Sequence, residues 1–155
     1  MLLPGTAAPD ITLPDLDGAA WTLREALRSG PVVLAFFKIS CSTCQLTFPF
    51  LQRFLDSPHG GAALIAVSQD DVPAAREFQQ RFGVSMPTLI DAEPVYAASN
   101  AYRIASVPSI FVIETDGRIA LAVEGFHKTA LEDLGRRFGV APFREGERVP
   151  AVQPG

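Results

Sequence analysis

The sequence predicts an α/β protein, a three-layer sandwich whose helices cover both faces of a mixed central sheet, with a β-hairpin added at the N-terminal end. Residues 32–37 and 62–67 are apolar runs rich enough in β-branched side chains to be strands buried on both faces. A stretch with apolar residues at helical spacing follows each of them. Further along, a turn sequence at 115–118 separates two more apolar runs, which predicts an antiparallel pair of strands. A sheet with parallel and antiparallel parts follows from this order.

The N-terminal hairpin is predicted from the first part of the chain. Residues 11–13 form a short apolar run bounded by turn formers, and Asp17 with Gly18 is a strong turn signal. Residues 21–23 provide the returning strand. A single helical turn over residues 23–27 follows it.

The longest predicted helix follows the first buried strand. Ser40 is a suitable N-cap for it, and apolar side chains continue at helical spacing as far as Phe54. Pro49 lies inside this helix and is expected to kink it.

The remaining elements alternate in the same way. They are a helix over residues 72–82, a strand at 88–90, a helix over 94–102, strands at 109–114 and 119–123, and a helix over 129–138. From residue 141 onward the chain mixes Pro, Gly, Glu and Arg with few large apolar residues, which is typical of a frayed or surface-lying end. We therefore assign residues 1–140 to one domain and residues 141–155 to a flexible tail.

Composition narrows the classes of function. A length of 155 residues with 48% apolar and 19% charged residues fits one folded domain with one core. The formal net charge of −4, without a cluster of Lys and Arg, disfavours nucleic acid and anionic membranes as partners. No stretch is long enough to span a bilayer, and no basic segment precedes an apolar run at the start. We expect a cytoplasmic location for the chain as given, and a periplasmic one if a leader has been removed.

The two cysteines, Cys41 and Cys44, lie three positions apart directly after the first buried strand. A disulfide between them closes too small a ring to stabilise the fold strongly. A closed zinc site needs four ligands, and only His59 and His127 remain as soft partners. We interpret the pair as a redox-active dithiol, although two small core residues are the alternative. Cys41 at the helix N-terminus is then the attacking thiolate, Cys44 is the resolving thiol, and no other cofactor is expected.

With these residues in view, the chain resembles the thioredoxin superfamily, and within it the TlpA-like and redoxin branch that adjoins the AhpC/TSA peroxiredoxins. The resemblance covers roughly residues 4–138. It rests on residues 5–18, on Cys41-Ser42-Thr43-Cys44 with the following Phe48-Pro49, on residues 102–113 with Val107-Pro108-Ser109, and on the turn Asp116-Gly117-Arg118. It implies the thioredoxin fold and exchange of electrons with protein thiols and disulfides. It also implies an upstream thiol reductant or oxidant as a second partner, and we expect a monomer.

The resemblance also assigns roles around the cysteines. In that family the proline matching Pro108 is cis and lies against the CxxC motif. The preceding residue, Val107 here, offers its backbone to a bound substrate chain. Gly125 and Phe126 match the third wall of the substrate groove, although Phe126 suits the core equally well.

The chain departs from thioredoxin at several of these positions. Ser40 stands where thioredoxins have Trp, and Ser42 with Thr43 replaces Gly-Pro. These hydroxyls either hydrogen-bond the thiolate and lower its pKa or point into solvent. Ala35 occupies the position of the buried acid that deprotonates the resolving cysteine, which leaves water, a distant carboxylate or His127 as the proton acceptor.

Two other functions stay open. One is a thiol peroxidase of the peroxiredoxin type, but those enzymes use a Pro-x-x-x-Thr-x-x-Cys pattern. If Cys44 is the peroxide-attacking residue, Cys41 stands at the Thr position of that pattern and Phe37 at the Pro position, so neither supporting residue is present. The other is a copper or zinc carrier or a non-catalytic module, and the lack of Cys-rich or Met-rich surroundings argues against metal. The direction of electron flow is not set, because CxxC proteins of one fold span about 150 mV in reduction potential.

Overall fold

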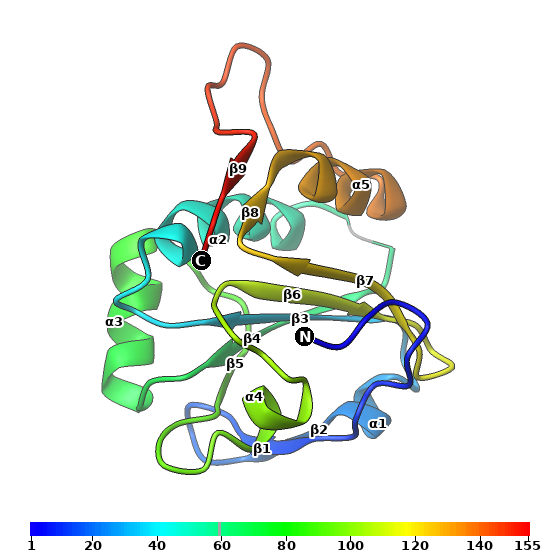
Figure 1. The fold of residues 1–155 in the computed structure, drawn as a ribbon, viewed down its shortest axis with the longest axis vertical. Helices are drawn as coiled ribbons and strands as arrows, with labels where there is room; N and C mark the ends of the chain where they lie inside the picture. The colour runs from blue at the N-terminus through cyan, green and yellow to red at the C-terminus, as the bar shows by residue number, and fades with distance from the viewer. Residues whose placement is uncertain (59) are drawn as a thin grey trace.

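A five-stranded mixed sheet in the order β5-β4-β3-β6-β7 crosses the middle of the molecule (Figure 1). The structure, a computed structural model, describes residues 1–58 and 60–155. Strand β3 lies in the centre, parallel to β4 and antiparallel to β6, while β5 runs parallel to β4 and β7 antiparallel to β6. The bounds are β3 (Val32–Phe37), β4 (Ala63–Ser68), β5 (Thr88–Ile90), β6 (Ser109–Ile113) and β7 (Ile119–Glu124).

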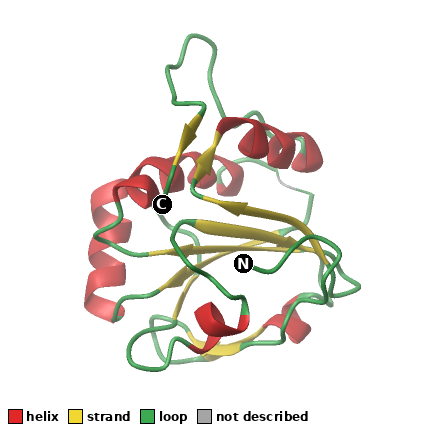
Figure 2. Cartoon of the chain, viewed as in Figure 1, coloured by secondary structure: helices red, strands yellow, loops and turns green. Residues whose placement is uncertain are grey.

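Helices cover both faces of this sheet (Figures 1 and 2). One face carries α2 (Ser42–Leu55), α3 (Val72–Phe82) and α5 (Lys128–Phe138). The other carries α1 (Leu23–Ala26), α4 (Ala97–Ala101) and the hairpin of β1 (Thr12–Pro14) and β2 (Ala20–Thr22). Every residue of β3 is buried, because its alternate side chains enter the two cores on opposite faces. The predicted sandwich with its N-terminal hairpin is confirmed.

One helix boundary differs from the prediction. A helix over residues 94–102 was expected, but α4 begins only at Ala97. The carboxylate of Asp91 accepts hydrogen bonds from the backbone N–H groups of Ala98 and Ser99, at 2.9 and 2.7 Å. Because these bonds satisfy donors of the first turn, they fix the helix start after Pro94.

The last residues of the chain return to the sheet end that carries the cysteines. Strand β9 (Val152–Gln153) pairs antiparallel with β8 (Phe126–His127), and Figure 1 shows the chain end beside α2. Before this strand, the ring of Phe143 lies 4.9 Å from that of Phe50 on α2. The tail therefore has defined contacts in the structure, while its flexibility stays a prediction.

Candidate active site

The two cysteines occupy the first turn of α2, at the carboxyl end of β3. Cys41 is itself the N-cap, with φ −85° and ψ 109°, and its Sγ accepts a hydrogen bond from the backbone N–H of Cys44 at 3.0 Å. The expectation that Ser40 caps this helix is wrong, because Cys41 occupies the extended capping position and Ser40 is exposed one residue outside it. A helix N-terminus therefore points its free N–H groups at the Cys41 sulfur.

The two thiols differ strongly in acidity. A hydrogen bond from the Cys44 thiol lowers the pKa of Cys41 from 9.0 to about 7, with the backbone N–H groups of Cys44 and Thr43 adding to the effect and burial opposing it. Burial raises the pKa of Cys44, which is fully buried, and its hydrogen bond to Cys41 acts in the same direction. Cys41 is therefore partly ionised at neutral pH while Cys44 stays neutral.

The loop before β6 lies directly against Cys41. The Val107–Pro108 peptide bond is cis, as expected, and the Cys41 thiol donates to the carbonyl oxygen of Val107 at 3.2 Å. The N–H of Gly125 donates to the carbonyl oxygen of Pro108 at 2.8 Å. The structure thus brings Cys41, Val107, Pro108 and Gly125 to one place.

The hydroxyls of the motif point elsewhere. Ser40 and Ser42 are exposed, whereas Thr43 is buried and its hydroxyl donates to the carbonyl oxygen of Pro154 at 2.5 Å. Within residues 1–58 and 60–155, no side-chain hydrogen bond joins any of these three hydroxyls to the Cys41 sulfur. The hydrogen bonds to that sulfur come from the helix backbone and from Cys44.

Two further sequence candidates lie beside this site without facing Cys41. Phe126 is fully buried and its ring packs against those of Phe50 and Phe143, so its side chain belongs to the core. His127 is half-buried at the N-cap position of α5. His59 lies outside the described residues.

Sequence reasoning missed Asp70. It follows β4 by two residues, is half-buried, and its Oδ2 accepts a hydrogen bond from the N–H of Ile39 at 2.7 Å. Its charge also raises the pKa of Cys44. Ala35 is buried in the same core cluster as Cys44. The signal was available, because carboxyl ends of neighbouring parallel strands meet at one sheet edge and a polar residue there faces the site.

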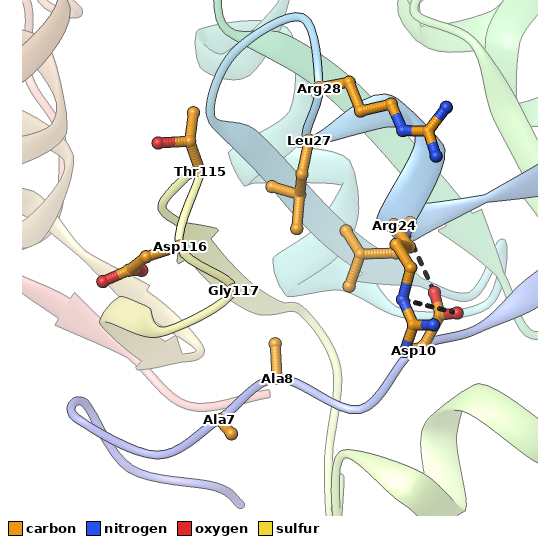
Figure 3. A pocket seen from close by; sticks show the side chains of 10 residues that line it. Ala7, Ala8, Asp10, Arg24, Leu27, Arg28, Thr115, Asp116 and Gly117 are labelled. Carbon is orange, nitrogen blue, oxygen red and sulfur yellow. Dashed lines mark hydrogen bonds and ion pairs between the residues drawn. The ribbon is translucent and has the colours of Figure 1, made fainter.

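A second hollow lies away from the cysteines. It has a volume of about 410 Å³ between the N-terminal segment, α1 and the turn after β6 (Figure 3). Figure 3 shows Arg24 turned toward Asp10, with which it pairs at 3.7 Å. Pro108 precedes one end of β6 and this turn follows the other, so the length of the strand, roughly 17 Å, separates the hollow from Cys41.

Within residues 1–58 and 60–155, no group of three or more His, Cys, Asp or Glu side chains is placed to hold a metal ion. No helix of the same residues is long and apolar enough to cross a membrane.

A cysteine pair at the start of the helix after a central strand, facing a cis-proline loop, defines a thioredoxin-fold protein with a dithiol site. Residues 4–122 match the AhpC/TSA family, and the chain belongs to that family.

Named relatives and solved structures agree with this class. Thiol-disulfide oxidoreductase ResA of Geobacillus thermodenitrificans is 28% identical over 123 residues, which cover 78% of this chain and 69% of ResA. The thioredoxin domain of a thiol-disulfide oxidoreductase from Bacteroides vulgatus superposes with a TM-score of 0.75 at 21% identity, covering 89% of this chain and 99% of that one. Peroxidoxin BcpB from Mycobacterium tuberculosis has a TM-score of 0.70 at 20% identity, covering 88% and 98%. These structures share the fold.

Proposed function

We propose that the protein is a thiol-disulfide oxidoreductase that exchanges two electrons with protein disulfides through Cys41 and Cys44. The observation that carries this proposal is the placement of the two sulfurs. Cys41 Sγ caps a helix N-terminus and accepts from the thiol and the backbone N–H of Cys44, which lowers the pKa of Cys41, whereas Cys44 is buried, which raises its own pKa. The disulfide that the two cysteines form is the only redox group the proposal needs.

In the reducing direction, the Cys41 thiolate attacks one sulfur of the substrate disulfide. A bond forms between Cys41 and that sulfur, the substrate S–S bond breaks, and the second substrate sulfur leaves as a thiolate that takes up a proton. Cys44 then loses its proton and attacks Cys41 Sγ, which releases the first substrate sulfur and leaves a Cys41–Cys44 disulfide. The substrate gains two electrons and two protons, and a thiol reductant restores the dithiol by the reverse steps.

The carbonyl oxygen of Val107 has a part in this cycle. In the dithiol state it accepts the hydrogen bond of the Cys41 thiol. Once Cys41 is ionised or bonded to substrate it has no proton to donate, so this oxygen becomes free to accept from a backbone N–H of a substrate chain. Val107 therefore orients a polypeptide while its disulfide reacts.

The AhpC/TSA membership keeps thiol peroxidase chemistry as the alternative. A peroxide-attacking cysteine must be a thiolate, and burial of Cys44 opposes its ionisation. Phe37 and Cys41 also stand where that chemistry needs Pro and Thr. Rapid, saturable consumption of hydrogen peroxide that depends on Cys44 would favour this alternative over disulfide exchange.

The test compares two single substitutions that remove one sulfur each. Cys41→Ser should abolish reduction of insulin, because it removes the nucleophile. Cys44→Ser should accumulate mixed disulfides with protein partners on Cys41, because the resolving step is lost. An active Cys41→Ser protein would overturn the assigned roles. Mass spectrometry of trapped partners from cell extract identifies the substrates, and equilibration in glutathione buffers gives the direction of electron flow.

A further inference from the structure

We propose that residues 151–155 form a cover over the surface between β8, the first turn of α2 and Val107, here called the groove. A protein substrate must displace this cover and a small disulfide need not. The proposal rests on the proposed function and adds a specificity-determining segment to it. This segment, the cover, contacts three separate parts of the site.

The first contact is with the strand that leads into α5. In the cover, Gln153 pairs with Phe126 and Val152 with His127 in antiparallel register. The N–H of Lys128 donates to the carbonyl oxygen of Ala151 at 2.9 Å. The cover thus occupies, through its main chain, the edge where an extended peptide could add a strand.

The second contact is with the first turn of α2. The hydroxyl of Thr43 donates to the carbonyl oxygen of Pro154 at 2.5 Å, and the side-chain amide of Gln153 donates to the same hydroxyl at 2.9 Å. Thr43 is buried and lies between the two cysteines in the sequence. These bonds tie the cover to the turn that carries the reacting sulfurs.

The third contact is with the cis-proline loop. Gly155 approaches Val107 so closely that a Cβ on it would lie 2.2 Å from the Val107 carbonyl oxygen. A Cβ on Gly125 would likewise lie 2.7 Å from the carbonyl oxygen of Gln153. Because the cover fills the space beside Val107 down to the backbone, a substrate chain cannot occupy it at the same time.

The cover is tethered by contacts that precede it. Arg53 on α2 donates from its two terminal nitrogens to the two carboxylate oxygens of Glu147, each at 2.7 Å. It also donates to the carbonyl oxygen of Pro142 at 2.8 Å. These contacts hold residues 142–147 on α2, so the cover competes at the high effective concentration of a tethered segment.

The cover does not enclose Cys41 fully. With residues 151–155 in place, Cys41 is still only half-buried, whereas Cys44 is buried. A small disulfide can therefore reach the nucleophile past a closed cover, but a folded protein that needs the Val107 backbone cannot. This difference in access predicts a difference in substrate preference.

The experiment uses three variants of the full protein and two substrates. The first variant ends at Pro150 and so lacks the cover, and the second is Gln153→Ala. The third is the control Val152→Ala, which changes a residue of the same strand that is 55% exposed. The reaction of each reduced protein with insulin and with hydroxyethyl disulfide is followed as kcat/KM. Removing the cover should raise kcat/KM for insulin about tenfold, which corresponds to a groove open about one-tenth of the time in the intact protein. Gln153→Ala should give a smaller rise, and Val152→Ala none.

The rate with hydroxyethyl disulfide should stay within about twofold in all variants, because this substrate does not need the covered groove. An unchanged or lower insulin rate after removal of residues 151–155 would overturn the proposal. An equal rise with both substrates would also overturn it, since the segment would then shield Cys41 itself.

A second readout does not depend on turnover. Alkylation of Cys41 by a polyethylene glycol maleimide should speed up without the cover, while alkylation by N-ethylmaleimide should not. If no variant reduces either disulfide, the proposed function is wrong. The ratio of the polyethylene glycol maleimide rate to the N-ethylmaleimide rate still tests the cover. An equal ratio with and without residues 151–155 would refute the cover.

Discussion

Removing the Cys44 thiol should make Cys41 a weaker acid. The hydrogen bond from that thiol is the largest cause that lowers the pKa of Cys41, and burial is the main opposing one. Cys44→Ala deletes the donor, so the pKa of Cys41 should rise from about 7 toward or beyond 9.0. Cys44→Ser keeps a hydroxyl that can donate, so its pKa should lie between those of the other two proteins.

The size of the effect follows from the two pKa values. At pH 7 a thiol with a pKa of about 7 is about half ionised, whereas one with a pKa of 9.0 is about 1% ionised, a difference of about fiftyfold. Nucleophilicity falls with pKa with a slope of about one-half, which costs the more acidic thiolate about tenfold. The intact protein should therefore react about fivefold faster than a protein with an unperturbed Cys41 at pH 7, and about tenfold slower well above pH 9.

The assay is the rate of iodoacetamide alkylation of Cys41 as a function of pH, read by mass spectrometry. The alkylation rate of the intact protein should level off about one unit above pH 7. The rate of Cys44→Ala should be lower near pH 7 and should exceed that of the intact protein at higher pH. A midpoint near 9.0 in the intact protein would refute the activation by the helix end and Cys44. Superimposable profiles of the intact protein and Cys44→Ala would show that the backbone N–H groups alone activate Cys41.

Three further perturbations test other parts of the structure. Asp70→Asn removes a charge that raises the pKa of Cys44 but keeps an acceptor for the N–H of Ile39. Cys44 should then ionise more readily, so the mixed disulfide on Cys41 should decay faster in quenched-flow measurements. Slower decay would instead identify Asp70 as the base that takes the proton of Cys44. Arg53 lowers the pKa of Glu147 from 4.5 to about 2, so this pair should stabilise the fold fully above about pH 4.5 and lose its effect as pH falls through about 2. Glu147→Gln should remove that pH-dependent part of the urea midpoint, and an unaltered profile would contradict it. Phe78→Ala should cost about 3–5 kcal/mol in denaturant unfolding, because its fully buried ring packs 4.5 Å from that of Phe37, whereas an effect below about 1 kcal/mol would mean that the core refills.

Elements set by local patterns were predicted well from the sequence. The apolar run of β3 matches its strand residue for residue, and α3 ends at Gly83, whose φ of 64° suits glycine. The cysteines and Pro108 were also found, because a short motif and the family resemblance mark them. Their meeting at the Val107 oxygen is visible only in three dimensions.

The errors and omissions involve contacts between distant residues. The start of α4 depends on Asp91, which lies outside the helix and accepts from its first N–H groups. Pairing of β8 with β9 involves two residues on each side, too few for any alternation of polar and apolar side chains to reveal it. The bond from Thr43 to Pro154 joins residues 111 positions apart.

The bond between Thr43 and residue 154 has a thermodynamic consequence for the cysteine pair. It fastens the cover to the helical turn that carries both cysteine sulfurs, and formation of the disulfide takes the Cys41 sulfur from the Val107 oxygen to Cys44. Binding equilibria at coupled positions are reciprocal, so a redox state that holds the cover more firmly is itself favoured to the same extent. A tenfold preference of the cover for one state shifts the midpoint potential of the pair by about 30 mV. Displacement of the cover by a bound protein would thereby retune the potential of the site at the moment when electrons are exchanged.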